Sequence, residues 1–282
     1  MSPESATEPE PTREPRVAAA LLLVANVLFF WPVLFHGRVF SSHGAVNAVY
    51  PWHADDGDPR NALLADPASA GAPFLRELPE RILWNRSAAG GAPGAVNIVQ
   101  GFLSPFAWVP ALLLPEAAVE TGILFLKLNA GFFFLFVYLR RHGLSETAAS
   151  CGAAAWGWSG AQSAWWLWMQ SSVTIAIPLL LLALDRARHD ARFSRAIALS
   201  SLLLVVYLSG GYPFMILFGG AAGAAYALGA AWRRPAAESW RAAGRIAASG
   251  ALALGLLLPA ILVSARMIRA SGQVAARAGL AD

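Results

Sequence analysis

The sequence contains little charge, one cysteine and one lysine. Only 13% of its 282 residues are charged and 57% are hydrophobic, whereas about a quarter of the residues in soluble domains are charged. This composition excludes an ordinary soluble domain, which could not bury so much apolar surface. The single cysteine, Cys151, excludes an intramolecular disulfide and any metal site built from several cysteines.

The net charge of +4 does not indicate a nucleic-acid partner. All the basic residues except one lysine are arginines, and they stand in short runs between long apolar stretches. That arrangement sets membrane topology and is not a phosphate-binding surface. We therefore expect a lipid bilayer as the partner and no nucleic acid. The abundance of arginine, alanine and glycine favours a bacterial source, and hence the bacterial cytoplasmic membrane.

The apolar stretches predict an all-α integral membrane protein with about seven transmembrane helices. A crossing needs roughly 20 apolar residues. Ser159, Gly160 and Gln162 interrupt one uncharged run of double length, and residues 209–213 interrupt another, so each run is interpreted as a helical hairpin. The predicted helices occupy residues 17–36, 121–139, two segments within 146–185, two within 196–232, and 246–264.

The arginine runs predict a cytoplasmic amino terminus. Arg13 and Arg16 precede the first helix, and neither hairpin turn carries arginine or lysine. This topology requires that the short apolar segment 102–114 is re-entrant or interfacial. The first helix is interpreted as an uncleaved anchor, with a cleaved signal peptide as the alternative. The predicted regions are a disordered tail (1–16), the first helix (17–36), an extracytoplasmic loop (37–120), a six-helix region (121–265) and a truncated extracytoplasmic tail (266–282).

The long first loop contains most of the polar residues outside the spans, and its tryptophans predict short amphipathic helices at the membrane surface. It holds an Asn-x-Leu-Leu-x-Asp-Pro element at 61–67, then Pro73, Leu-Trp-Asn at 83–85, a glycine turn ending at Pro93, and Asn97 with Gln100. This order resembles the YfhO-like branch of the GT-C superfamily of polytopic membrane glycosyltransferases. The chain departs from that family at Ile82 and Arg86, where proline is usual, and family members are longer.

The resemblance implies transfer of a sugar from a polyprenyl-phosphate donor to an extracytoplasmic glycan, lipid or protein acceptor. Asp66 stands where the family has an essential acidic residue, so the resemblance implies a catalytic carboxylate there; a turn or N-cap role before Pro67 is the alternative. Substrate-binding roles are expected for Trp84, Asn85, His53 and Gln100. For His53, a proton carrier beside the aspartates and an ordinary interfacial histidine are the alternatives. The chain then represents the amino-terminal portion of such an enzyme.

Lys127 is the unusual charge of the predicted spans, since it lies about two turns inside the outer end of its helix. Its ammonium could bind the donor's phosphate, or the side chain could extend to the outer headgroups. The carboxylates Asp55, Asp56 and Asp58 could hold a divalent cation, or could belong to a solvated turn.

Three further features have ordinary structural interpretations. Asn129 is predicted to join two helices, Asp185 to form an ion pair with Arg186 or Arg188, and the tryptophans at 165, 166 and 168 to form an aromatic belt or to stack on sugars. Two other functions stay open. These are a transporter or lipid-handling membrane protein without covalent chemistry, and an inactive fragment of a longer enzyme.

Overall fold

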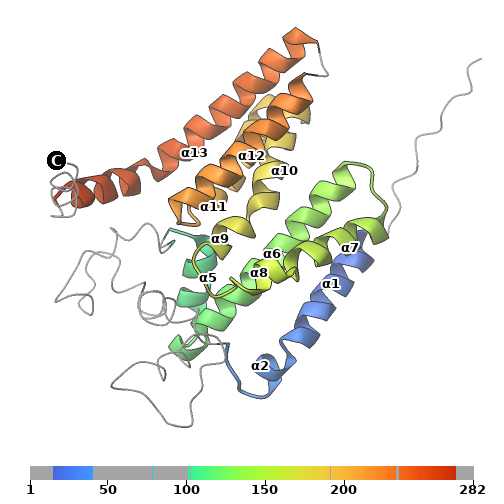
Figure 1. Cartoon of the computed structure of the whole chain (residues 1–282), viewed down its shortest axis with the longest axis vertical. Helices are drawn as coiled ribbons and strands as arrows, with labels where there is room; N and C mark the ends of the chain where they lie inside the picture. The colour runs from blue at the N-terminus through green and yellow to red at the C-terminus, as the bar shows by residue number, and fades with distance from the viewer. Residues whose placement is uncertain are drawn as a thin grey trace, which may run out of the picture.

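All regular secondary structure in the described part of the chain is helical. The computed structural model describes residues 15–40, 101, 103–190, 192–232 and 235–270, together with Leu78. A 3-10 turn, Glu116–Ala118, leads into α6. The helices are α1 (Pro15–Phe29), α2 (Trp31–Phe35), α5 (Pro105–Leu113), α6 (Val119–Arg141), α7 (Glu146–Gly157), α8 (Gly160–Ser163), α9 (Ser171–Thr174), α10 (Ile177–His189), α11 (Phe193–Leu208), α12 (Pro213–Ala231) and α13 (Ala236–Ala270) (Figure 1).

Three helical segments are long and apolar enough to cross a membrane: Glu116–Arg141, Pro213–Ala231 and Ala236–Arg266. The described residues therefore agree with an all-α membrane protein. That the chain crosses the membrane seven times stays a prediction. The short apolar segment before α6 forms α5, whose nine residues extend about 14 Å and cannot cross a hydrocarbon core of about 30 Å.

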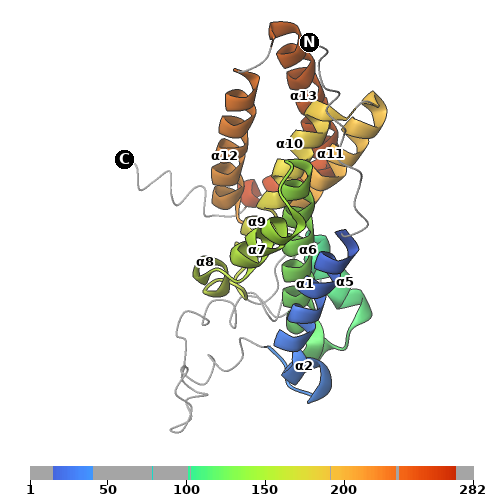
Figure 2. The ribbon, with the colours of Figure 1, turned by 90° about the vertical axis from the view of Figure 1, so that its right-hand side faces the viewer.

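Helix α6 lies at the centre of the molecule, with α1 and α7 on one side and α10 on another (Figures 1 and 2). Leu128 and Phe132 pack into a core shared with α1 and α7. A second core joins α10 and α11, where the buried Tyr207 donates a hydrogen bond to the carbonyl of Ile216 in α12 at 2.8 Å. These contacts give α6 and α10 the most enclosed positions.

Helices α12 and α13 are mostly exposed, although both are strongly apolar. On α12 only Gly219 and Gly223 are buried, while Phe214, Leu217 and Phe218 lie on its surface. Soluble proteins rarely expose apolar patches of this extent, whereas lipid chains cover such surfaces readily. The exposed faces therefore support a membrane environment for this part of the chain.

The ends of the helices that carry arginine gather at one end of the bundle. Arg141 at the end of α6 contacts Asp185 near the end of α10, and Arg245 of α13 donates to the carbonyl of Asp190 at 2.9 Å. His142, which follows α6, lies 3.2 Å from the Tyr226 hydroxyl of α12. We refer to this region as the basic end of the bundle.

The two predicted hairpins differ in the structure. The turn expected at 209–213 is confirmed, because α11 ends at Leu208 and α12 begins at Pro213. The break after α7 is longer than expected and extends from residue 158 to residue 176, with only α8 and α9 inside it. Helices α7 and α10 are thereby shortened to 12 and 13 residues, or about 18 and 20 Å.

Candidate functional site

Of the site residues predicted from the sequence, the structure describes Lys127. The others lie outside the described residues. They are the catalytic candidate Asp66, the substrate-binding candidates His53, Trp84, Asn85 and Gln100, and the cation candidates Asp55, Asp56 and Asp58.

Lys127 lies in the interior of the bundle, on the face of α6 that meets the long break. The residue is 5% exposed. The ammonium donates a hydrogen bond to the Ser171 hydroxyl at 2.7 Å and a longer one to the Trp166 carbonyl at 3.4 Å. The ammonium therefore contacts protein atoms in the interior. It does not extend toward the lipid headgroups, which was the alternative predicted from the sequence.

The ammonium is held by neutral oxygens and is not paired with an acid among the described residues. Burying an unpaired ammonium is unfavourable, because its charge loses hydration that two neutral acceptors only partly replace. An ammonium also has three donors, and the described contacts occupy two of them. Lys127 therefore has hydrogen-bonding capacity left to bind an anion, and a bound anion would offset the cost of burying the ammonium charge.

The break that receives Lys127 is held in place by its own hydroxyl groups. The Ser159 hydroxyl accepts from the backbone N–H of Gln162 at 3.3 Å, which caps α8. Thr174 donates to the side-chain oxygen of Gln162 at 3.1 Å, and Ser171 donates to the carbonyl of Trp168 at 2.6 Å. These bonds satisfy backbone and side-chain groups that lie outside regular helix inside an apolar bundle.

Several polar atoms in and next to this break are buried without a partner among the described residues. They are the indole N–H groups of Trp156, Trp166 and Trp168 and the side-chain oxygen of Gln170, which is 6% exposed overall. An unsatisfied buried group costs about 1–3 kcal/mol, so such groups usually mark a ligand, an ion or a bound water.

Sequence reasoning predicted an aromatic belt here or sugar stacking on its rings. Trp165 is partly exposed and packs edge-on against Trp168, with ring centroids 5.2 Å apart. Trp166 turns inward and meets Phe29 of α1. The three tryptophans therefore do not form a uniform lipid-facing belt, since one of them contributes to the contact between the break and α1.

Asn129 joins two helices, as the sequence predicts. The side-chain amide of Asn26 in α1 donates to the side-chain oxygen of Asn129 at 3.0 Å. Asn129 in turn donates to the carbonyl of Phe125 at 2.8 Å. This pair anchors α1 to α6 half a turn beyond Lys127, which fixes the position of α1 beside the candidate site.

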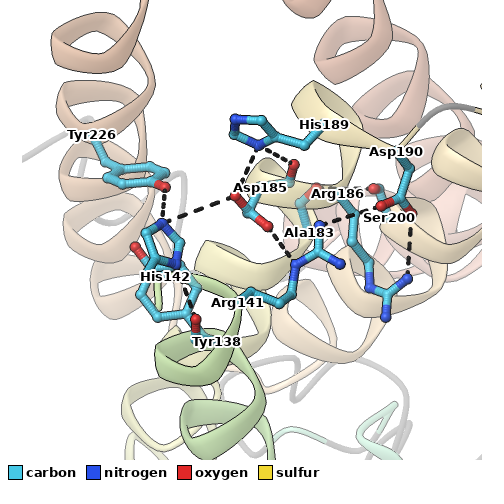
Figure 3. A network of polar contacts seen from close by, with 10 residues as sticks. All are labelled: Tyr138, Arg141, His142, Ala183, Asp185, Arg186, His189, Asp190, Ser200 and Tyr226. Atoms are coloured by element: carbon cyan, nitrogen blue, oxygen red, sulfur yellow. Dashed lines mark hydrogen bonds and ion pairs between the residues drawn. The ribbon is translucent and has the colours of Figure 1, made fainter. Parts of the chain in front are cut away.

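The basic end of the bundle contains a second polar group, centred on Asp185 (Figure 3). The carboxylate of Asp185 is 4% exposed and accepts from the guanidinium of Arg141 at 2.6 Å. His189 lies 2.9 Å from its other oxygen, and His142 lies 4.0 Å from that same oxygen. The prediction of an ion pair at Asp185 is confirmed, but the partner named for it is wrong. Arg186 pairs with Asp190 instead, at 3.3 Å.

The partner was missed because Arg141 stands 44 positions earlier in the chain. Only the packing of α6 against α10 brings the two groups together, and no local spacing signals it. Although two histidines and an aspartate meet here, no group of three or more His, Cys, Asp or Glu that could hold a metal occurs among the described residues. The group at Asp185 joins the ends of α6 and α10.

Comparison with known proteins identifies no relative of this chain. The chain matches no protein-family model, no curated protein and no solved structure. Lys127 and the break between α7 and α10 form the candidate site.

Proposed function

We propose that this chain is a membrane glycosyltransferase of the GT-C type, which moves a sugar from a polyprenyl-phosphate donor to an extracytoplasmic acceptor. The observation that carries the proposal is the buried ammonium of Lys127, held by Ser171 and Trp166 without a described carboxylate. A lipid-linked phosphate is an anion that reaches such a position from within the bilayer. The motif order of the first loop supports the same conclusion.

The proposal includes seven crossings with a cytoplasmic amino terminus in a bacterial cytoplasmic membrane. The gathering of arginines at the basic end supports this orientation, since positive residues near span ends stay in the cytoplasm. The short helices α7 and α10 agree with membrane crossings if each arm of the first predicted hairpin consists of two helical pieces. From the start of α9 to the end of α10 the chain covers about 28 Å, close to one hydrocarbon core of about 30 Å.

In the proposed reaction, the acceptor hydroxyl attacks the anomeric carbon of the donor sugar. The bond from that carbon to the phosphate oxygen breaks, and a new bond to the acceptor oxygen forms. Asp66 takes the acceptor proton, and the Lys127 ammonium stabilises the negative charge on the departing polyprenyl phosphate. His53, Trp84, Asn85 and Gln100 are proposed to bind the sugar or the acceptor.

A divalent cation on Asp55, Asp56 and Asp58 is a separate part of the proposal and rests on the sequence alone. Clustered carboxylates are the ligands that such a cation prefers, and a bound cation would neutralise phosphate charge. Lys127 can supply a positive charge without it. The role assigned to Lys127 does not depend on the cation.

A second candidate function is transport or lipid handling without covalent chemistry. One observation favours it specifically: a broken helical element, from α7 to α10, lies beside a buried ionisable residue. Transporters bind substrates at such breaks near the middle of the bilayer. Both functions use Lys127 to bind an anion, and they differ in whether the sugar–phosphate bond is broken.

The test is binding of polyprenyl phosphate to the purified full chain in detergent. Lys127→Met keeps the length of the side chain and removes the charge, whereas Lys127→Arg keeps the charge. We expect about tenfold or greater weakening in Lys127→Met and partial recovery in Lys127→Arg, because one charge-assisted hydrogen bond contributes about 1.5–3 kcal/mol. Glu146→Gln, at the basic end, is the matched control and is expected to bind as the unmodified chain does.

Equal binding by Lys127→Met and the unmodified chain, with both folded, would contradict the proposed role of Lys127. Incubation with a sugar-loaded donor then separates the two functions. Release of free polyprenyl phosphate supports group transfer, whereas binding without release favours transport or lipid handling.

A further inference from the structure

An apolar groove with one charged residue runs between α6, α10 and α11. Its volume is about 650 Å³, and every lining side chain except Arg186 is apolar. At the end away from Arg186, α5 contributes to the lining and thereby limits the groove. Its walls include Leu126, Ala130 and Val137 of α6, Leu182 of α10, and Leu203 of α11.

The length of the groove matches one leaflet of a bilayer. From Leu126 to Val137 the axis of α6 rises about 16 Å, and half of a hydrocarbon core of about 30 Å is about 15 Å. A transmembrane helix from another protein would need the whole thickness of the core. The groove therefore suits an acyl chain of a lipid whose headgroup lies level with Arg186.

Arg186 can bind an anion at the open end of the groove. Its described polar contact is a single 3.3 Å bond to Asp190, which uses one of the five N–H donors of a guanidinium. Two adjacent N–H groups of a guanidinium can bind the two oxygens of a phosphate together. Arg186 also stands near Arg141 and Asp190 in the group shown in Figure 3, where it remains partly exposed.

The basic end of the bundle, which includes Arg186, carries more positive than negative charge among the described residues. Basic surfaces at the ends of membrane helices attract anionic lipids. The described arginines of the basic end are Arg140, Arg141, Arg186, Arg188, Arg192, Arg195, Arg241 and Arg245, and the acidic residues are Glu146, Asp185, Asp190 and Glu238.

We propose that this groove binds one anionic phospholipid from the leaflet at the basic end. One acyl chain lies along α6 between α10 and α11, and the phosphate accepts hydrogen bonds from Arg186. The apolar lining selects a lipid over a free phosphate, and the arginine selects an anionic headgroup over a zwitterionic one. This inference does not rest on the proposed glycosyl transfer.

Native mass spectrometry of the full chain tests the proposal. Phosphatidylglycerol is compared with phosphatidylcholine of identical acyl chains. We expect one phosphatidylglycerol to remain bound preferentially. Arg186→Gln should weaken that binding about tenfold, because it removes a charge-assisted hydrogen bond, and Arg186→Lys should restore part of it. Ala130→Phe should reduce binding of both lipids because the new ring fills the groove.

Two matched controls separate the groove from general lipid binding. Arg195→Gln removes an exposed arginine from the same end, and Ala251→Phe adds a ring to an exposed position on α13. Both are expected to bind phosphatidylglycerol as the unmodified chain does. Equal loss in Arg195→Gln and Arg186→Gln would overturn the proposal in favour of non-specific charge. Undiminished lipid binding in Ala130→Phe would also overturn the proposal. A dimer that Ala130→Phe dissociates would do the same, since a second copy of the chain would then occupy the groove.

Discussion

Replacing Asp185 by asparagine should destabilise the bundle strongly. The asparagine side chain would keep the shape of the aspartate but lose the charge that Arg141 meets at 2.6 Å and His189 at 2.9 Å. Removing one partner of a buried ion pair costs about 3–5 kcal/mol. Because Arg141 is 29% exposed and can recover part of its hydration, we expect a loss of about 2–3 kcal/mol.

The neighbouring Asp190 provides the matched control. Its side chain is 17% exposed, and its bonds to Arg141 and Arg186 are longer, at 3.2 and 3.3 Å. We expect Asp190→Asn to cost about 1 kcal/mol or less, as for other partly exposed ion pairs. The comparison separates the buried position of Asp185 from the general presence of charge at this end.

The assay is reversible unfolding of the full chain in mixed micelles with increasing denaturing detergent, followed by far-ultraviolet circular dichroism. The double variant Asp185→Asn with Arg141→Gln should be less destabilised than the sum of the two single variants, with a coupling of about 1–2 kcal/mol. Equal stability of Asp185→Asn and the unmodified chain would show that the ion pair at Asp185 does not stabilise the bundle. Equal effects of Asp185→Asn and Asp190→Asn would refute the importance of burial.

Three further predictions test the fold. Gly157→Ala should destabilise the chain by about 1–3 kcal/mol, because the added methyl group would overlap a buried phenylalanine ring of α6. Gly160→Ala should have little effect, because its methyl group would meet nothing within 4 Å. Thermal unfolding of the two variants checks this difference. Asn129→Ala should cost about 1 kcal/mol, the usual contribution of a hydrogen bond between membrane helices, in the same detergent titration. Ser163→Cys in a Cys151→Ser background should react with an impermeant maleimide in intact spheroplasts, and labelling only after lysis would reverse the proposed orientation.

Hydropathy and charge predicted much of the helical arrangement because they act locally. The turn between α11 and α12 was predictable because residues 209–213 include two glycines and a proline within an apolar run. Tyr212 itself adopts a left-handed conformation there, with φ 49°. The beginning of α13 at Ala236 was not predicted, since residues 236–245 are good helix formers but too polar to register as a membrane span.

The length of the break between α7 and α10 could not be read from the sequence. The polar residues of this charge-free run occur in continuous helix and in irregular chain alike, so its composition fixed only the approximate position of the turn. The contacts of Lys127 depend on that break, because Ser171 and Trp166 reach the ammonium only when the chain leaves the helix. Lys127 itself was predictable as an unusual charge within an apolar segment.

We propose that Asp66 and Lys127 act together in sugar transfer from a lipid-linked donor. Cell-envelope glycans and lipid-linked sugars should be compared in the native host with the gene intact, deleted, or carrying Asp66→Asn or Lys127→Met. We expect that deletion and both substitutions abolish the same sugar and accumulate the same donor, while each variant remains in the membrane at normal abundance. Loss of the sugar on deletion but not in either variant would contradict this proposal.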